Sequence, residues 1–496
     1  MNSKVIIKSV EGSLAGQEFE FNEPVICMIG RAEDCRIVLP DSSENKGVSR
    51  HHCLLDIVPP KIHVRDLGSS NGTWINEMNI ASLSDLKNGP ARNHTQRDSV
   101  LKDGDRFRVG KNLFEIHIFS FFGEMDHPGT AHLEKSEAFV QTFVDSIPSS
   151  VSEKADFFNS PCGYCGKDLS YWIHVKKEDK AVCPACQNNP VQIARFLTEE
   201  AGEKTLASIQ GYTVKKILGE GGMGVIFLLQ HKREKDRLLV LKLMKPHISS
   251  DEISRKRFIR ECWITQFLKH PNIVRQYDHT CYEGYVFFTL EYCNLGDVQQ
   301  WMNENTGSLP VMESVQVISQ ALDGLHYGHT FEFDYPSDEG TLIQVRGLVH
   351  RDIKPSNILL CGTTTNRIAK LADFGLAKAL NQAGLSNCTK TGSSAGTPAF
   401  VSRKQLLDFK HASVQSDIWS LAASLYFMIC GAYPRDFPEN MDPFLVVAET
   451  EPLSILKRNP AVPVSLAKVI DAALRDTGES AFSSALDFKK ALEEAF

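Results

Sequence analysis

The stretch from Leu348 to Leu360, LVHRDIKPSNILL, sets charged and polar side chains between two short apolar runs. The polar members are His350, Arg351, Asp352, Lys354, Ser356 and Asn357. Burying an ionised group costs several kcal/mol unless it is paired or put to use. The two apolar runs, 348–349 and 358–360, are expected to be short buried strands. A charged cluster between them therefore predicts a reactive site rather than ordinary packing.

A glycine-rich run, LGEGGMGVIFLL, precedes this cluster in the chain. Gly219, Gly221 and Gly224 have no Cβ, so the backbone could approach phosphate oxygens closely. A dinucleotide-binding fold would continue with a helix and an acidic residue about 20 positions on. Here an apolar strand, VIFLL, follows instead, and Lys242 comes 18 residues after Gly224. The context disfavours dinucleotide binding and leaves a nucleotide-phosphate role.

Two carboxylates complete the set. Glu261 lies in RKRFIRECWITQFLKH, whose apolar spacing predicts an amphipathic helix, and it is the expected partner of Lys242. Asp373, in LADFGLA, comes 21 residues after Asp352. Together the residues supply a lysine for phosphates, Asn357 and Asp373 as Mg²⁺ ligands, and Asp352 to orient a hydroxyl nucleophile. For any one residue taken singly, a solvated charge or a structural ion pair is the alternative.

The elements that must position these residues divide the chain into several units. Residues 1–120 alternate polar and apolar side chains in short runs between turns, which predicts an all-β sandwich. Residues 211–496 begin with strand-like runs and then become helical, which predicts an α+β domain. Between them we expect a linker at 121–158, a four-cysteine segment at 159–196 and a second linker at 197–210.

Over 211–496 the chain resembles the protein kinase family, above all the bacterial serine/threonine kinases of eukaryotic type. This resemblance implies a bilobal kinase fold and phosphoryl transfer from ATP to protein Ser/Thr. It makes Asp352 the catalytic base, with Lys354 steadying the transferred group, and it makes Asp417 the anchor of the catalytic-loop backbone. The residues that it assigns to ATP binding are Leu218, Gly219, Glu220, Gly221, Gly222, Met223, Gly224, Val225, Ile226, Val240, Lys242, Leu290, Glu291, Cys293 and Asp297.

Three features depart from the family pattern. In GTPAFVSRKQ, Arg403 and Lys404 stand where the family has the Pro-Glu of its Ala-Pro-Glu motif, and Ser480 stands where the arginine partner of that glutamate is expected. Loss of both partners predicts a folded lobe with a looser activation segment. Val240 replaces a usual alanine over the adenine, and residues 330–345 read as a surface insertion. Arg403, Lys404 and Val240 support an alternative function, a pseudokinase scaffold.

Arg351 beside Asp352 implies control by phosphorylation of the activation segment. The candidate acceptors are Thr389, Thr391, Ser393 and Ser394.

The N-terminal unit carries three loop motifs, IGR, VSRHHC and DLGSSNGTWIN. In this order they resemble the forkhead-associated (FHA) domain. The resemblance implies phosphothreonine-peptide binding, with Arg31 and Ser49 on the phosphate, Arg50 beside it and Asn71 on the peptide backbone. The kinase's own phosphorylated activation segment is one candidate ligand. A sandwich with ordinary turns is the alternative.

Four of the thirteen cysteines form two CxxC pairs, and the other nine are single. Cys162, Cys165, Cys183 and Cys186 have 17 residues between the pairs, a spacing that can close a tetrahedral zinc site. So short a segment would depend on the metal for its folding energy. It resembles a zinc ribbon, with redox pairs or buried single cysteines as the alternative.

Composition limits the other classes of function. The net charge is −7 and the pI is about 6.2, so no basic field indicates nucleic acid. The N-terminus lacks a signal-peptide pattern, and the longest apolar run, 421–431, is too short to span a bilayer. We expect a cytoplasmic protein with no membrane span that acts on protein substrates.

Overall fold

A computed structural model describes the chain in segments. The described residues are 3–23, 25–81, 98–120, 191, 194, 198, 209–220, 224–244, 265–282, 285–336, 342–374, 398–407, 412–439, 441–476 and 481–495.

The N-terminal unit is a sandwich of two sheets, as the alternating runs predict. One sheet has the strand order β2-β1-β11-β10-β7-β8 and the other β4-β3-β5-β6-β9. The strands are β1 (Ser3–Glu11), β2 (Glu18–Phe21), β3 (Val25–Gly30), β4 (Ile37–Val38), β5 (Cys53–Val58), β6 (Lys61–Asp66), β7 (Thr73–Ile75), β8 (Met78–Ala81), β9 (Asp98–Leu101), β10 (Arg106–Val109) and β11 (Asn112–Ser120). Inward-facing aliphatic and aromatic side chains, such as Ile7, Phe107 and Phe114, fill the space between the sheets.

A five-stranded antiparallel sheet begins the C-terminal unit, in the order β12-β13-β14-β16-β15. Its strands are β12 (Tyr212–Glu220), β13 (Gly224–His231), β14 (Leu238–Met244), β15 (Gln276–Tyr282) and β16 (Tyr285–Leu290). One face carries the core of this lobe, which includes Phe227, Leu241 and Phe287. Because neighbouring side chains in a strand point to opposite faces, the alternate residues are free to face a cleft.

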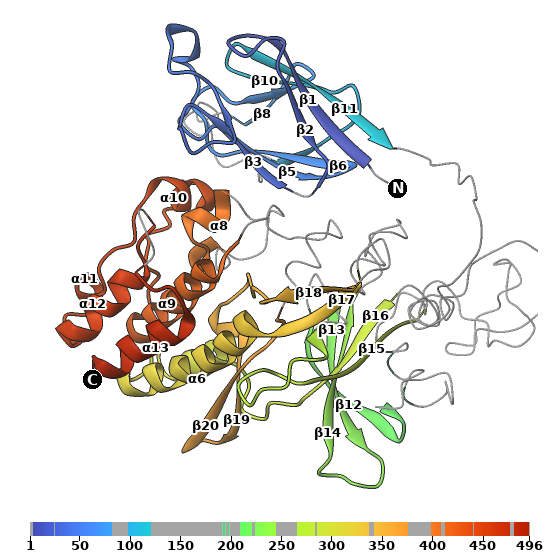
Figure 1. Ribbon diagram of the computed structural model, residues 1–496, viewed down its shortest axis with the longest axis vertical. Helices are drawn as coiled ribbons and strands as arrows, with labels where there is room; N and C mark the ends of the chain where they lie inside the picture. Colours follow the sequence, from blue (N-terminus) through green and yellow to red (C-terminus); the bar gives the residue numbers. More distant parts are fainter. Residues whose placement is uncertain are drawn as a thin grey trace, which may run out of the picture.

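The rest of the unit is a helical lobe with two short hairpins, so the strands-first order of the sequence is confirmed (Figure 1). The helices are α5 (Val298–Glu304), α6 (Val311–Thr330), α8 (Arg403–Leu407), α9 (Val414–Cys430), α10 (Pro443–Glu449), α11 (Ile455–Arg458), α12 (Val464–Ala473) and α13 (Ala485–Glu494). The hairpins are β17 (Glu332–Pro336) with β18 (Leu342–Arg346), and β19 (Ile358–Thr363) with β20 (Asn366–Leu371).

Helix α9 is the buried centre of this lobe. The apolar run that is too short to span a bilayer lies within it, and α6, α12 and α13 pack around it. Ser416 Oγ accepts the Ser413 N–H (3.4 Å) at its start, and Gly431 ends it with φ of 65°. A left-handed residue at this position favours glycine. Among the helices of the described residues, none is long and apolar enough to cross a membrane.

One expectation about local structure needs correction. Ile358–Leu360 begin strand β19, but residues 348–349 form no strand. The Leu348 N–H instead donates to the Gly328 carbonyl at the end of α6 (2.9 Å), because the chain here turns toward the catalytic loop. The segment expected as a surface insertion contains the antiparallel hairpin β17–β18.

Candidate functional site

A cleft of about 760 Å³ lies between the sheet of the C-terminal unit and its helical lobe. It brings together predicted residues from four parts of the chain: Leu218, Ile226, Val240, Lys242, Leu290, Glu291, Cys293, Asp297, Asn357 and Asp373. Val225 is different, because its side chain is 1% exposed and packs in the core on the other face of the sheet. Gly221, Gly222, Met223 and Glu261 lie outside the described residues.

Lys242, on strand β14, reaches across the cleft to Asp373. Its Nζ is 2.6 Å from both carboxylate oxygens of Asp373. Burial acts to raise the pKa of Asp373, but the charge and hydrogen bonds of Lys242 outweigh it and hold that pKa below its usual value. The ion pair therefore exists at neutral pH and is lost only as acid protonates the carboxylate through this lowered pKa. The expected pairing of Lys242 with Glu261 stays a prediction.

The catalytic loop brings two of the predicted side chains, Lys354 and Asn357, to the carboxylate of Asp352. Lys354 Nζ donates to both oxygens of Asp352 (3.0 and 2.9 Å). Asn357 Nδ2 donates to the Asp352 carbonyl (2.7 Å) and to its carboxylate (3.0 Å). The amide nitrogen of Asn357 is thus engaged, and its oxygen is the atom left to face a cation. Carboxylate and amide oxygens are ligands that Mg²⁺ accepts.

Asp417, from the core helix α9, holds the backbone of this loop, as predicted. Its carboxylate accepts the N–H groups of His350 (2.7 Å) and Arg351 (2.8 Å), and His329 Nε2 lies 2.8 Å from it. Arg351 has φ of 71°, a conformation that side-chain-bearing residues rarely adopt. The buried carboxylate offsets that backbone strain, which cannot be read from the residue types alone.

The far end of the cleft has the geometry of a nucleoside site. Val240 and Leu290 are paired in neighbouring strands and both line the cleft. The Glu291 carboxylate pairs with Lys370 (3.1 Å), so the backbone of Glu291–Cys293 is what can face a base. Asp297 caps helix α5 by accepting the Gln300 N–H (2.9 Å), and burial raises its pKa. The second oxygen of the Asp297 carboxylate can accept a hydrogen bond from a hydroxyl group.

Sequence reasoning missed several lining residues and one ion pair. Lys216, Gln300 and Leu359 also line the cleft. Arg435 and Asp476 form a hydrogen-bonded ion pair that is almost fully buried. Asp476 also accepts the N–H of Arg403 (3.1 Å), so other contacts hold the region where the family's glutamate–arginine pair is missing. No motif in the sequence links Arg435 to Asp476, because the two residues are far apart in the chain.

The predicted phosphopeptide residues lie together on loops at one end of the sandwich. Arg31 donates to the Val48 carbonyl (2.7 Å) and pairs with Asp41 (2.5 Å). Asn71 Nδ2 donates to the Gly47 carbonyl (2.7 Å), and Ser49 Oγ accepts the Ser70 N–H (3.3 Å). The loops can meet closely because Gly30 has no Cβ. A Cβ at this position would lie 1.9 Å from the Arg50 carbonyl oxygen.

Gly219, Glu220 and Gly224 are described but are not among the residues that line the cleft. Two further groups of site predictions fall outside the described residues. They are the zinc candidates Cys162, Cys165, Cys183 and Cys186 and the phosphorylation candidates Thr389, Thr391, Ser393 and Ser394.

Replacing Asp417 tests whether its carboxylate holds the catalytic loop. Asp417→Ala removes the fully buried acceptor of two backbone N–H groups and of His329, so we expect a loss of roughly 3–5 kcal/mol in unfolding free energy. Chemical denaturation measures it. The control is Asp436→Ala, which removes an exposed partner of Arg458 and should cost about 0–1 kcal/mol. Equal losses in the two variants would contradict the anchoring role.

Comparison with known proteins agrees with this geometry. Residues 212–475 match the model of the protein kinase domain, and residues 27–110 match that of the FHA domain. The probable serine/threonine-protein kinase PknB of Lactococcus lactis is 29% identical over 52% of this chain and 38% of its own length. The serine/threonine-protein kinase PknJ of Mycobacterium tuberculosis is 28% identical over 58% of this chain and 45% of its own length.

The chain thus covers less than half the length of these two relatives. A crystal structure of the Mycobacterium tuberculosis PknI kinase domain matches 58% of this chain and 96% of its own, with 25% identity and a TM-score of 0.42. The kinase-domain match covers more than half of the 496 residues. The chain therefore belongs to the protein kinase family and joins a bilobal kinase fold to an FHA β-sandwich.

Proposed function

We propose that the protein is a serine/threonine kinase that transfers the γ-phosphoryl group of ATP to proteins. One observation carries the proposal: Lys242, Asp373 and Asn357 line a single cleft in the described structure, and the Asn357 amide donates to the Asp352 carboxylate, so the proposed base lies next to that cleft. The curated relatives named as serine/threonine kinases support the same reaction.

Each residue has a part that its surroundings allow. Bound ATP with Mg²⁺ supplies the phosphoryl group and the cation that neutralises its charge. Lys242 could move from Asp373 to phosphate oxygens, and Asp373 and the Asn357 amide oxygen would hold the cation. Asp352 accepts the proton of the Ser or Thr hydroxyl, and Lys354, which is already on Asp352, balances the charge. Glu261 would take over Lys242 from Asp373 in the loaded state.

The rival function is a catalytically silent scaffold that reads phosphothreonine through its FHA domain. Arg403, Lys404 and Val240 favour it, because they depart from the family pattern. Against it, all five residues of the catalytic set are present in the sequence, namely Lys242, Glu261, Asp352, Asn357 and Asp373. Lys242 also forms an ion pair with Asp373, and Lys354 forms one with Asp352, so both carboxylates are held in position at the site.

The FHA sandwich is proposed to bind phosphothreonine peptides through Arg31, Ser49, Arg50 and Asn71. Three of these side chains contact the backbone of neighbouring loops, which holds them at one end of the sandwich. An incoming phosphate would replace Asp41 as the anionic partner of Arg31. The activation segment with Thr389 and Thr391 is the ligand that the chain itself offers.

The two CxxC pairs are proposed to form a structural zinc ribbon. Tetrahedral thiolate ligation would supply the folding energy that so short a segment lacks. Purified protein should contain one tightly held zinc ion by mass spectrometry, and Cys162→Ser should lower that content. Cys293→Ser, a single cysteine in the kinase hinge, should not. Zinc-free protein with unchanged secondary structure would contradict the ribbon.

Asp352→Asn should slow phosphoryl transfer strongly. Removing the base lowers the rate by about 10²–10⁴-fold while the cleft keeps its shape. Radiolabelled ATP with Mg²⁺, the protein itself and a generic Ser/Thr substrate provide the measurement, and mass spectrometry should place the label among Thr389, Thr391, Ser393 and Ser394. Transfer that persists in Asp352→Asn would overturn the assigned base. No transfer by the intact, ATP-binding protein would favour the scaffold.

Arg31→Ala should weaken binding of a peptide of residues 383–397 phosphorylated at Thr389 or Thr391. A hydrogen bond to a charged group contributes about 1.5–3 kcal/mol, so the expected loss is about 10- to 150-fold. Fluorescence anisotropy measures the affinity, with the unphosphorylated peptide as a blank. Arg36→Ala, which removes another exposed arginine of the sandwich, should bind as wild type does. Wild-type affinity in Arg31→Ala would rule out this role.

A further inference from the structure

The outer face of one sandwich sheet is buried, although the outer face of such a sheet ordinarily meets water. Every residue of β3 is buried, as are the first five of β5. Cys27 and Ile29 point into the sandwich core, whereas Ile26, Met28 and Leu54 join a second apolar cluster outside it. An antiparallel sheet with one wet face alternates polar and apolar residues, and VICMIG does not.

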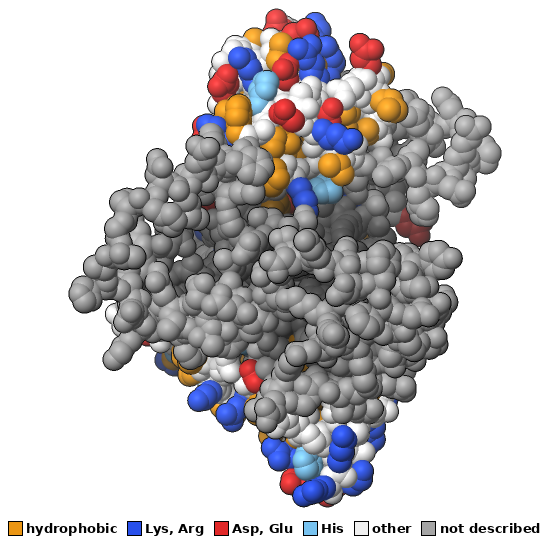
Figure 2. All heavy atoms as spheres, turned by 90° about the vertical axis from the view of Figure 1, so that its right-hand side faces the viewer, with side chains coloured by type: hydrophobic (Ala, Val, Ile, Leu, Met, Phe, Trp, Pro, Cys, Tyr) orange, Lys and Arg blue, Asp and Glu red, His pale blue; other side chains and the backbone are white. Residues whose placement is uncertain are grey.

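The opposite sheet of the sandwich provides an internal contrast. On β1, Lys8 and Val10 are exposed and alternate with buried Ile7 and Ser9. On the face of the sandwich that Figure 2 presents, basic, acidic and apolar side chains are interspersed. Buried and exposed residues thus alternate on β1 but not on β3 and β5.

The kinase lobe of the same chain covers the buried face. Leu406 of α8 and Val447 and Ala448 of α10 complete the second cluster, and Figure 1 shows both helices beneath β3, β5 and β6. The sandwich contributes Ile26, Met28, Ala32, Cys35, Leu54 and Leu67, and the partly buried Val401, Leu407, Phe437, Phe444 and Leu445 pack at its edge. The covering surface is therefore built from α8, α10 and the residues around them.

A buried ion pair fixes the orientation of the two units. Arg65 Nη2 lies 2.9 Å from Asp442 Oδ2, with exposed side-chain fractions of 12% and 1%. The Arg65 guanidinium also lies over the ring of Phe444, 5.1 Å from its centroid. Asp442 in addition caps α10 by accepting the Phe444 N–H (2.9 Å). Separating the units would break this ion pair and the contact of Arg65 with Phe444.

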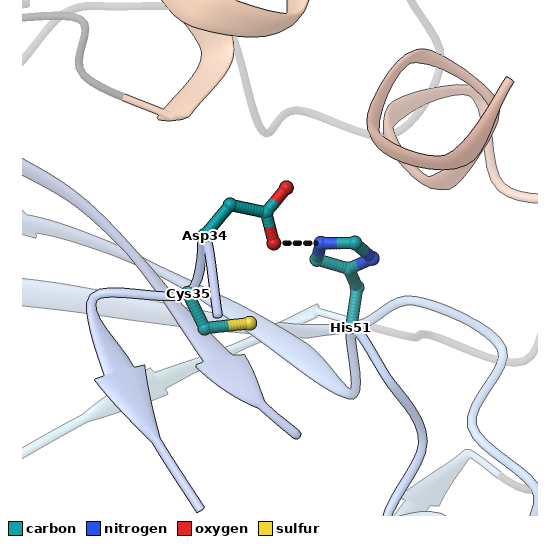
Figure 3. Close-up of side chains that lie close together, drawn as sticks. All are labelled: Asp34, Cys35 and His51. Carbon is teal, nitrogen blue, oxygen red and sulfur yellow. Dashed lines mark hydrogen bonds and ion pairs between the residues drawn. The ribbon is translucent and has the colours of Figure 1, made fainter. Parts of the chain in front are cut away.

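His51 forms the second polar contact, and it directly follows Ser49 and Arg50 in the chain. Its Nε2 lies 2.8 Å from Asp34 Oδ1, as Figure 3 shows, and its Nδ1 lies 3.2 Å from Glu449 Oε1 at the end of α10. Cys35 lies beside them. Its thiol donates to the Arg50 carbonyl (3.4 Å), and burial raises its pKa to about 12. A protonated thiol and an imidazole engaged at both nitrogens favour an imidazole bridge between carboxylates over a metal site.

The contact continues from α10 to the catalytic loop. Arg403, the first residue of α8, binds the end of α10 through the carbonyls of Thr450 (3.2 Å) and Val447 (3.4 Å) and through Glu451 (2.9 Å). Two residues on, Gln405 Nε2 donates to the Arg351 carbonyl (2.8 Å). Arg351 is the strained residue that precedes the proposed base.

We propose that the FHA sandwich docks on α8 and α10 of its own kinase lobe and that this contact helps to hold the catalytic loop in place through Arg403 and Gln405. The docking is read from packing and polar contacts alone. The effect on catalysis rests on the proposed kinase activity. Arg403 acts as a positioning residue, which gives a structural reason for the departure from the family's proline, a residue that could make none of the three side-chain contacts.

Leu54→Lys tests the docking in the full-length protein. Leu54 packs only on the outer face, so a lysine there should leave the sandwich folded and separate it from the kinase lobe. Hydrogen exchange should rise in residues 441–451 and 403–407. The control, Val10→Lys, places the same charge on the outer face of the opposite sheet, where Val10 is 37% exposed. Glu449→Ala removes a contact from the kinase side without altering the sandwich, and it should act in the same direction.

The same variants test the effect on catalysis. Leu54→Lys should lower kcat for phosphoryl transfer by about 2- to 30-fold. KM for ATP should stay within about twofold, because α8 and α10 contribute nothing to the lining of the cleft among the described residues. Arg403→Met should show the same split, and Arg403→Lys should restore part of kcat. Lys404→Met, an exposed neighbour on α8, should behave as wild type.

Each outcome decides a separate part of the proposal. Wild-type exchange in Leu54→Lys and Glu449→Ala would overturn the docking. Increased exchange with unchanged kcat would overturn the support of the catalytic loop. Light scattering would show whether the wild-type protein is a dimer. If it is, and if Leu54→Lys converts it to a monomer, the kinase lobe that covers the sandwich belongs to a second copy of the chain, and the proposal of docking within one chain is wrong. Absence of phosphoryl transfer in wild type would count against the proposed function, and the exchange data would still decide the docking.

Docking should also depend on pH through His51. Burial lowers the pKa of His51, but its hydrogen bonds to Glu449 and Asp34 outweigh burial and raise that pKa above its usual value. The charged and titratable groups around it are Asp34, Cys35 and Arg50 from the sandwich and Glu449 from α10.

A raised histidine pKa gives stability that is complete below the ordinary pKa and is lost as pH rises through the raised one. Exchange in 441–451 should therefore increase over that range. In His51→Gln the increase should vanish, and an unchanged pH response in this variant would rule out His51 as the origin.

Discussion

The structure depends on one buried carboxylate. Asp417 lies on the central helix of the kinase lobe, fully buried, and accepts two successive backbone N–H groups of the catalytic loop. Those bonds fix Arg351 in a left-handed conformation and so determine where Asp352 points. The carboxylate can hold this position because α9 is packed on all sides by apolar residues. Core packing and loop geometry are thus parts of one arrangement, and the proposed chemistry follows from it.

Around that anchor, a lysine pairs with each of the two carboxylates proposed for catalysis. Lys242 forms an ion pair with Asp373, and Lys354 forms one with Asp352. Both pairs are only partly buried, so their charges remain available to an incoming nucleotide. The same loop is reached from the other side by Gln405 on α8, the helix that the FHA sandwich covers. The catalytic loop is therefore held by the core helix below it and, through α8, by a second domain.

The sequence allowed most of the site to be predicted, because local motifs carry it. The order and spacing of Lys242, Asp352, Asn357 and Asp373 predicted the cleft, and the alternation of residues 1–120 predicted the sandwich. Val225 was placed at the nucleotide because it belongs to the glycine-rich motif, but strand alternation turns its side chain into the core. Partners far apart in sequence were missed, as with Arg435 and Asp476. The unbroken apolar run of β3 did contain the signal for a covered outer face.

Binding of ATP with and without Mg²⁺ tests the central claim most directly, namely that the clustered charges act together on one nucleotide. Isothermal titration should show that Mg²⁺ tightens ATP binding to wild type, because Asp373 and Asn357 supply oxygen ligands for it. In Asp373→Ala this gain should disappear while the affinity for Mg²⁺-free ATP stays close to wild type. A gain of equal size in wild type and Asp373→Ala, or no Mg²⁺ effect in wild type, would contradict the claim.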